Sequence, residues 1–366
     1  MGVYDSSKRI FYYDMLRVMA IFLVVLCHVS TEFCKYSQVG TFRWYSAALY
    51  MDIGTLGVPI FLMISGALLL NKDYELSDFM KRRFSRILIP FMFWALLLPI
   101  CKMMFLNHPW TFAEYYNLLF FDQYWFVWML IGAYLLLPIL NSFVRDYEIK
   151  GLEYILIIWF ISMFLLRDIP FDLFRNIVST YTLGWVELFA GYFGYLPLGY
   201  YLSVKKFKWD DRKLYLIGLA IFMIFTIINM SATIVNSPKI NDVAFFSYNS
   251  VISTMQAIGL FLFIEYFSKY CETNHNTWKN KIHSFFKDNN HMSKIILSIS
   301  ICSYGIYLTH YFILYPLMYI NNNYIGIFTR NPIILPIVWF FVVIMAWILI
   351  MIISKIPILK QFSGAH

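Results

Sequence analysis

Ten apolar runs, each about as long as a membrane-spanning helix, constrain this chain more than any other feature of its sequence. A helix needs about 20 mostly apolar residues to cross the ~30 Å hydrocarbon layer of a bilayer. Hydrophobic residues make up 60% of the 366 residues and charged residues 14%, whereas soluble chains carry about 25% charged residues. We predict an all-α fold, a polytopic membrane helix bundle of about ten transmembrane helices, with no separate soluble domain. The runs cover approximately residues 15–33, 48–70, 87–106, 123–143, 152–166, 183–203, 214–235, 248–268, 295–320 and 332–354.

The basic residues alternate from one loop to the next. The N-terminal segment, the C-terminal tail and every second loop together hold 21 Lys and Arg residues, whereas the other loops hold 7. Cytoplasmic loops of membrane proteins carry an excess of Lys and Arg. We therefore predict that both termini are cytoplasmic, in a multi-pass protein of the cell (plasma) membrane that contacts membrane lipids. The net charge of +8 then reflects topology, and we predict no binding of nucleic acid.

The first apolar run contains two residues that are costly in hydrocarbon, Arg17 and His28, eleven positions apart. At about 100° and 1.5 Å per residue, they lie within about 20° of one helix face and roughly 16 Å apart along it. Titratable side chains inside membrane spans usually face the bundle interior or a wet cavity, so we predict that both line one cavity at two levels. Two alternatives remain open: Arg17 reaches the interface and pairs with Asp14, and His28 hydrogen-bonds a backbone carbonyl.

Two further arginines precede the third run. Arg83 and Arg86 are three positions apart, so both guanidinium groups share one face if a helix begins before them. The planar guanidinium fork makes bidentate contacts with phosphate. We predict that Arg83, Arg86 and Arg17 converge at the cytoplasmic mouth of the cavity. The alternative is that this basic loop marks topology and contacts lipid headgroups.

Four more residues are candidates for substrate binding. Ser65 ends a glycine-containing run, Trp125 opens the fourth run, and Tyr307 and His310 share one face of the ninth. The alternatives are helix packing for Ser65, interfacial anchoring for the aromatic residues and a packing role for His310. The five cysteines lack the spacing of metal ligands, and we predict no metal site.

Several segments, taken in order, resemble the integral-membrane acyltransferase-3 family. They cover roughly residues 10–355, and the Gly-Val-Pro-Ile-Phe sequence at residues 57–61 resembles the branch of stand-alone surface-polysaccharide O-acetyltransferases. The resemblance implies one acyltransferase-3-like transmembrane domain over residues 1–366. The segments are Arg17 to His28 as R-x10-H, Gly57–Gly66, Arg83 to Arg86 as R-x-x-R followed by Pro90, Trp125-Phe126 with Leu130–Gly132, Gly191–Tyr201, and Ser303–His310.

The resemblance implies a membrane O-acyltransferase that moves an acetyl group from cytoplasmic acetyl-CoA to a hydroxyl of a cell-surface polysaccharide or its lipid-linked precursor. In family terms, the positions of Arg17 and His28 are needed for activity, and Arg83 and Arg86 are proposed to hold acyl-CoA. Some members carry a C-terminal extracytoplasmic esterase-like domain that completes the transfer. Here only twelve residues follow Ser354, so we expect the last step in the membrane domain or on a partner protein.

We expect His28 to act as general base for the acceptor hydroxyl, or to carry the acetyl group itself. Acetyl-CoA is anionic, so its phosphates are expected on Arg83 and Arg86, with Arg17 contacting them. The competing interpretation is a glycan or lipid-precursor transporter or flippase without acyl chemistry. Intramembrane Arg and His and broken helices also occur in transporters, and an inverted repeat between the halves, which we do not find, would favour that interpretation.

Overall fold

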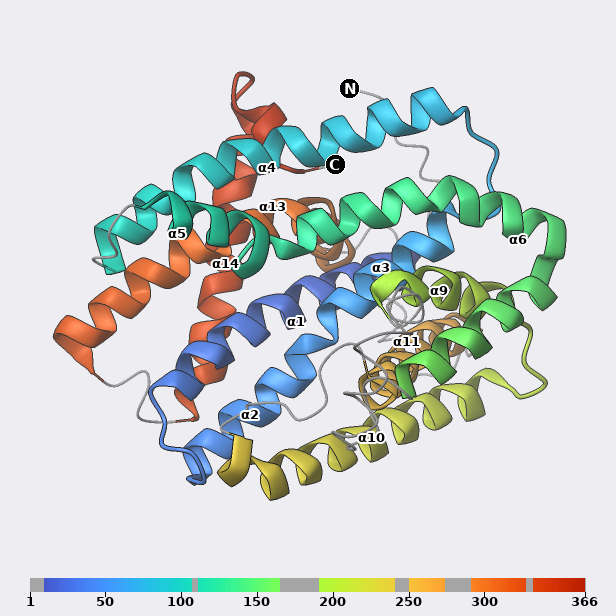
Figure 1. The fold of residues 1–366 in the computed structure, drawn as a ribbon, viewed down its shortest axis with the longest axis horizontal. Coiled ribbons are helices and arrows are strands. Elements are labelled where there is room, and N and C mark those ends of the chain that lie inside the picture. Colours follow the sequence, from blue (N-terminus) through green and yellow to red (C-terminus); the bar gives the residue numbers. More distant parts are fainter. Residues whose placement is uncertain are drawn as a thin grey trace, which may run out of the picture.

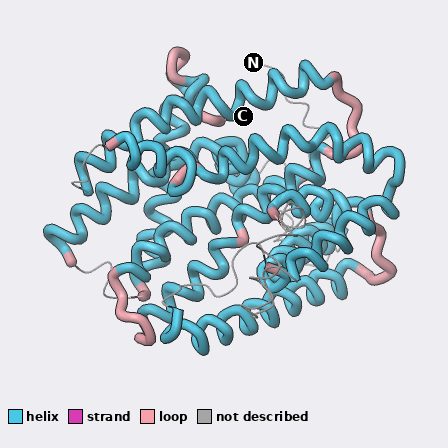
Figure 2. Tube along the Cα trace, viewed as in Figure 1, coloured by secondary structure: helices cyan, strands magenta, loops and turns pink. Residues whose placement is uncertain are grey.

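The computed structural model describes residues 10–106, 111–164, 191–240, 250–273, 291–326 and 332–365. Within these ranges every regular element is a helix and none is a strand (Figure 2), which confirms the predicted all-α fold. The helices form a bundle in which α1 lies near the middle (Figure 1). The longer elements are α1 (Phe11–Lys35), α2 (Phe42–Thr55), α3 (Gly57–Leu69), α4 (Leu76–Leu106), α5 (Phe112–Asn117), α6 (Trp125–Met163), α9 (Tyr195–Val204), α10 (Asp211–Ile240), α11 (Val251–Thr273), α13 (His291–Ile320) and α14 (Ile334–Lys355).

Eight stretches of helix in the described ranges are long and apolar enough to cross a membrane, so the chain is a multi-pass membrane protein. The spans predicted at about 123–143 and 152–166 both lie in α6, which consists of two helices joined at a kink and bends back on itself there (Figure 1). The bend lies at Glu148, whose φ of 50° and ψ of −140° are not helical. Arg145–Lys150, the charged residues between the two predicted runs, therefore form the turn that separates two helices, as the two runs predict. Of the span predicted at about 183–203, only the part from residue 191 lies within the described residues.

The second predicted span is two helices, because α2 ends at Thr55 and α3 begins at Gly57. Glycine allows both helices to approach α1 closely. A Cβ on Gly54 would lie 2.5 Å from the backbone N of Cys27, and one on Gly57 would lie 2.6 Å from the backbone O of Ala20. The break and the glycines therefore hold α2 and α3 against the helix that carries His28.

Helix α4 begins at Leu76, well before the span predicted from about residue 87, so Arg83 and Arg86 lie on a helix rather than in a loop. Asp78 in the first turn suits the positive N-terminal end of the helix dipole. Asp78 also pairs with Arg82 one turn later, at 2.9 Å. The apolar run alone gave too late a start, because the first turns of α4 carry the charges.

Segments predicted to lie on the same side of the membrane contact one another. Asp73, after α3, pairs with Arg145 of α6, and Lys205, after α9, pairs with Glu153 of α6 at 2.7 Å. We call this part of the bundle, with residues 72–86 and Arg145, the basic end. The placement of the basic end in the cytoplasm stays a prediction.

Candidate active site

A cavity of about 360 Å³ lies at the basic end between α1, α3, α4, α6 and α13. It brings together five candidate residues from distant parts of the sequence, Arg17, Ser65, Arg83, Arg86 and Tyr307. We call it the arginine cavity. The wall of this cavity combines three arginines with mostly apolar and hydroxyl-bearing side chains. Such a wall suits a ligand that has an anionic head and an uncharged arm. The other lining residues are Phe61, Ile64, Leu68, Leu69, Ile87, Phe126, Leu130, Tyr134, Ser300, Ile301, Ser303, Tyr304 and Gly364.

A buried carboxylate lies beside Arg17. Asp14 is only 4% exposed, and its Oδ1 lies 4.0 Å from Nη1 of Arg17. The same oxygen accepts a hydrogen bond from Oγ of Ser300 at 2.6 Å. The pairing with Asp14 that was the alternative for Arg17 is therefore present, but Arg17 also lines the arginine cavity. The two interpretations do not exclude each other.

Arg83 and Arg86 also line a second cavity of about 450 Å³, which we call the mouth cavity, around the turn after α3. Lys72 and Arg82 contribute further positive charge there, alongside three acidic residues, Asp73, Glu75 and Asp78. Oη of Tyr74 in the same wall is buried and has no hydrogen-bond partner among the described residues. Burial raises the pKa of Tyr74, so its hydroxyl stays neutral and able to donate. The mouth cavity therefore offers both cations and a hydroxyl donor to a phosphate.

The segment after α14 forms another part of the wall. The carbonyl oxygen of Phe362 accepts a hydrogen bond from Nε1 of Trp94 of α4 at 2.8 Å. The next residue packs so closely on α13 that a Cβ on Gly305 would lie 2.2 Å from the carbonyl oxygen of Ser363. Gly364 lines the arginine cavity. The segment thus joins α4 to α13 beside the arginines, which no sequence motif indicated.

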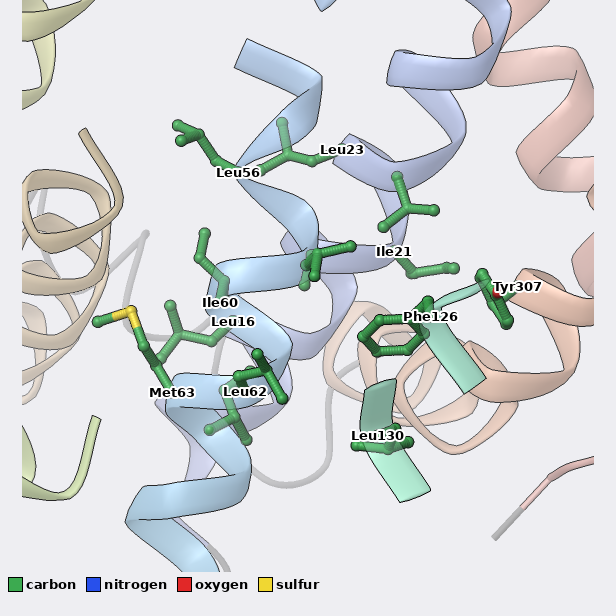
Figure 3. Packing of buried hydrophobic residues seen from close by; sticks show 14 of the residues in the cluster. Leu16, Ile21, Leu23, Leu56, Ile60, Leu62, Met63, Phe126, Leu130 and Tyr307 are labelled. Carbon is green, nitrogen blue, oxygen red and sulfur yellow. The ribbon is translucent and has the colours of Figure 1, made fainter. Parts of the chain in front are cut away.

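His28 lines a separate chamber of about 30 Å³, the imidazole chamber, together with Trp125. Phe126 and Tyr307 line both this chamber and the arginine cavity. Their ring centroids are 5.3 Å apart at 69°, and they lie side by side in Figure 3. The single cavity predicted from the sequence is therefore divided by an aromatic pair. The remaining lining residues are Val24, Cys27, Gly54, Thr55 and Val58.

Both imidazoles near this chamber have one nitrogen engaged. Nδ1 of His28 lies 2.7 Å from Oη of Tyr311, which leaves Nε2 for a substrate. This tyrosine takes the place of the backbone carbonyl considered as the alternative partner. The His310 ring stacks on that of His28, with centroids 5.1 Å apart, and its Nδ1 lies 2.7 Å from the carbonyl oxygen of Tyr307. Because a carbonyl only accepts, Nδ1 of His310 carries the proton. Its Nε2 is then an acceptor, buried and without a hydrogen-bond partner among the described residues.

Tyr311→Phe removes the hydroxyl next to Nδ1 of His28 and keeps the ring. If the chain transfers acyl groups, as the resemblance implies, we expect the rate at saturating donor to fall by about 10- to 100-fold, the cost seen when a metal-binding imidazole loses the partner that orients it. The KM for acyl-CoA should change little, because Tyr311 does not line the arginine cavity. Donor titrations that follow CoA release from membranes measure both quantities, with Tyr319→Phe as the matched control on α13. A Tyr311→Phe rate equal to that of the parent chain would contradict the orienting role.

Two candidate substrate residues have local contacts as well. Oγ of Ser65 donates to the carbonyl oxygen of Phe61 at 2.9 Å, as expected of a small polar residue in a packed helix. Trp125 packs against Tyr192 with ring centroids 5.4 Å apart. Ser65 and Trp125 line the arginine cavity and the imidazole chamber, respectively, and their roles in substrate binding stay predictions.

Sequence reasoning missed three residues near the site: Tyr311, Phe126 as part of the dividing wall, and Asp52. Asp52 is 3% exposed and accepts hydrogen bonds from Nδ2 of Asn229 at 2.5 Å and from Nε2 of Gln256 at 2.9 Å. It anchors α2 to α10 and α11, two residues before the chamber wall at Gly54. An acid inside an apolar run is the same signal that singled out Arg17, so Asp52 could have been found.

The chain matches the family model described as an acyltransferase domain over residues 10–355. No curated protein and no solved structure matches it. The matched region includes all residues lining the arginine cavity and the imidazole chamber except Gly364. The family seen in the motifs is therefore confirmed, whereas the polysaccharide branch stays a prediction. The chain belongs to the acyltransferase-3 family and is a membrane acyltransferase.

Proposed function

We propose that this membrane acyltransferase takes an acetyl group from cytoplasmic acetyl-CoA and transfers it to a hydroxyl of a cell-surface polysaccharide or of its lipid-linked precursor. One observation carries the proposal. The cavity that holds three arginines and the chamber that holds His28 share a wall, made by Phe126 and Tyr307. An anionic donor bound at the arginines therefore has only one layer of side chains between its arm and the imidazole.

The donor would enter from the basic end. Its phosphates would bind Arg83 and Arg86, which line both the mouth cavity and the arginine cavity. The uncharged pantetheine arm would then lie along the hydroxyl-bearing wall of α13. The Tyr307 hydroxyl donates to the carbonyl oxygen of Gln123 at 2.9 Å, which fixes that ring. Phe126 has no polar group to anchor it, so we propose that its side chain moves aside to admit the thioester.

The chemistry then needs only His28 and the two substrates. Nε2 of a neutral His28 takes the proton of the acceptor hydroxyl as that oxygen attacks the thioester carbonyl carbon. A carbon–oxygen bond forms, the carbon–sulfur bond breaks, and the departing thiolate takes the proton from Nε2 to give CoA. The step uses the tautomer in which Nδ1–H of His28 donates to Oη of Tyr311, because only in that tautomer can Nε2 accept a proton.

The loop charges support the direction of transfer. If the basic end faces the cytoplasm, as the excess of Lys and Arg predicts, the arginines meet the cytoplasmic donor. His28 lies about 16 Å further along α1, toward the outer side, where a glycan acceptor is found. The same placement keeps the CoA phosphates out of the hydrocarbon layer.

Mass spectrometry of the surface glycan tests the proposal in cells with the gene, without it, and with the His28→Ala variant. We expect acetyl-sized mass increments to be present only with the parent gene, on a polymer that is otherwise unchanged. Loss of the entire polymer would instead support a transporter or flippase. A glycan whose acetylation is the same in all three strains would overturn the proposal.

A further inference from the structure

The imidazole chamber is far smaller than the cavity beside it. Its volume of about 30 Å³ compares with about 360 Å³ for the arginine cavity. A cavity needs about 10–15 Å³ of such volume to hold one water molecule, so this chamber has room for a group of only a few heavy atoms, such as an acetyl group. Whatever group reaches Nε2 of His28 from the donor side must therefore be short.

The part of the chamber wall that α1, α2 and α3 form has little room to yield, unlike the part at Phe126. Val24 of α1 and Val58 of α3 are 5% and 7% exposed. A Cβ on Gly57 would lie only 2.7 Å from Cγ2 of Val24, and a Cβ on Gly54 would lie only 2.5 Å from the backbone N of Cys27. Both α2 and α3 thus pack against α1 almost backbone to backbone beside the chamber. Dense interiors resist the insertion of additional methylene groups.

We propose that the imidazole chamber is the acyl-binding chamber and that Val24 and Val58 limit the donor to an acyl group of about two carbons. The inference rests on the proposed function and adds to it the residues that decide acyl length. An acetyl group places only a methyl beyond the reacting carbonyl. Propionyl and butyryl groups place one and two further methylenes against the two valines. In a fixed apolar pocket each methylene is worth roughly 10- to 200-fold in discrimination.

The test compares acetyl-, propionyl- and butyryl-CoA as donors. Membranes from cells that express the chain supply the acceptor, CoA release is measured, and His28→Ala membranes give the blank. The variants are Val24→Ala and Val58→Ala, on different helices, so that a folding failure in one leaves the other. Val25→Ala is the matched control, because Val25 is also buried, at 0% exposure, but does not line the chamber.

For the parent chain we expect kcat/KM to fall at least tenfold from acetyl- to butyryl-CoA. Val24→Ala and Val58→Ala should raise the butyryl-to-acetyl ratio at least tenfold, whereas Val25→Ala should leave it within about twofold of the parent ratio. Equal use of butyryl- and acetyl-CoA by the parent chain, or the same ratio in all variants, would overturn this inference and leave the proposed function standing. The absence of CoA release from acetyl-CoA above the blank would overturn both.

Discussion

His28→Ala is expected to abolish measurable acyl transfer, with a loss of about 10²- to 10⁴-fold, the range that a positioned general base contributes. Alanine removes the Nε2 that would take the acceptor proton and leaves Oη of Tyr311 without its 2.7 Å partner. Donor binding should persist, because His28 does not line the arginine cavity. The measurement is CoA release from acetyl-CoA, combined with equilibrium binding of acetyl-CoA to the same preparation.

His291→Ala provides the control for the removal of an imidazole. His291 is the exposed first residue of α13 and belongs to neither cavity, so its loss should leave the rate unchanged. Full activity in His28→Ala would exclude this imidazole from the chemistry. Loss of donor binding together with activity would mean that the variant is misfolded or that His28 belongs to the donor site.

Arg83→Ala and Arg86→Ala should each weaken acyl-CoA binding by about tenfold or more. A hydrogen bond to a charged group contributes about 1.5–3 kcal/mol, and every 1.4 kcal/mol corresponds to a tenfold change in affinity. The rate at saturating donor should change much less, because neither arginine lines the imidazole chamber. Titration of acetyl-CoA separates KM from kcat and so checks both expectations.

Lys81→Ala is the matched control on the same helix. Lys81 is exposed and lines neither the arginine cavity nor the mouth cavity. The substitution therefore removes one positive charge from the basic end without changing the proposed path of the donor. An equal rise in KM for Lys81→Ala would mean that the whole basic surface attracts the donor. An unchanged KM in both arginine variants would remove them from the donor site.

The positions of Arg17 and His28 followed from helix geometry alone, because an α-helix fixes the angle and rise between any two of its residues. Helix geometry could not predict that Arg17 lies close to Arg83 and Arg86, because these residues belong to different helices. That prediction came from the affinity of guanidinium groups for phosphate and from the family motif. The structure places all three on one cavity. The apolar runs predicted the helices well, since lipid demands that length of helix.

Other features depend on packing that no local pattern encodes. The contact between His28 and Tyr311 joins residues 283 positions apart, and the sequence carries no signal for that pairing. Phe126 is one of 36 phenylalanines in the chain, so its residue type did not single it out as part of a dividing wall.

Helix α1 carries both a guanidinium that lines the arginine cavity and the imidazole of the neighbouring chamber, so its own backbone sets the spacing between them. A substitution between Arg17 and His28 leaves the spacing of the two residues unchanged. One inserted residue would instead turn the imidazole by about 100° relative to the guanidinium and advance it by ~1.5 Å. The number of residues between Arg17 and His28 is therefore fixed, even where most of the side chains between them can be exchanged for others of similar size.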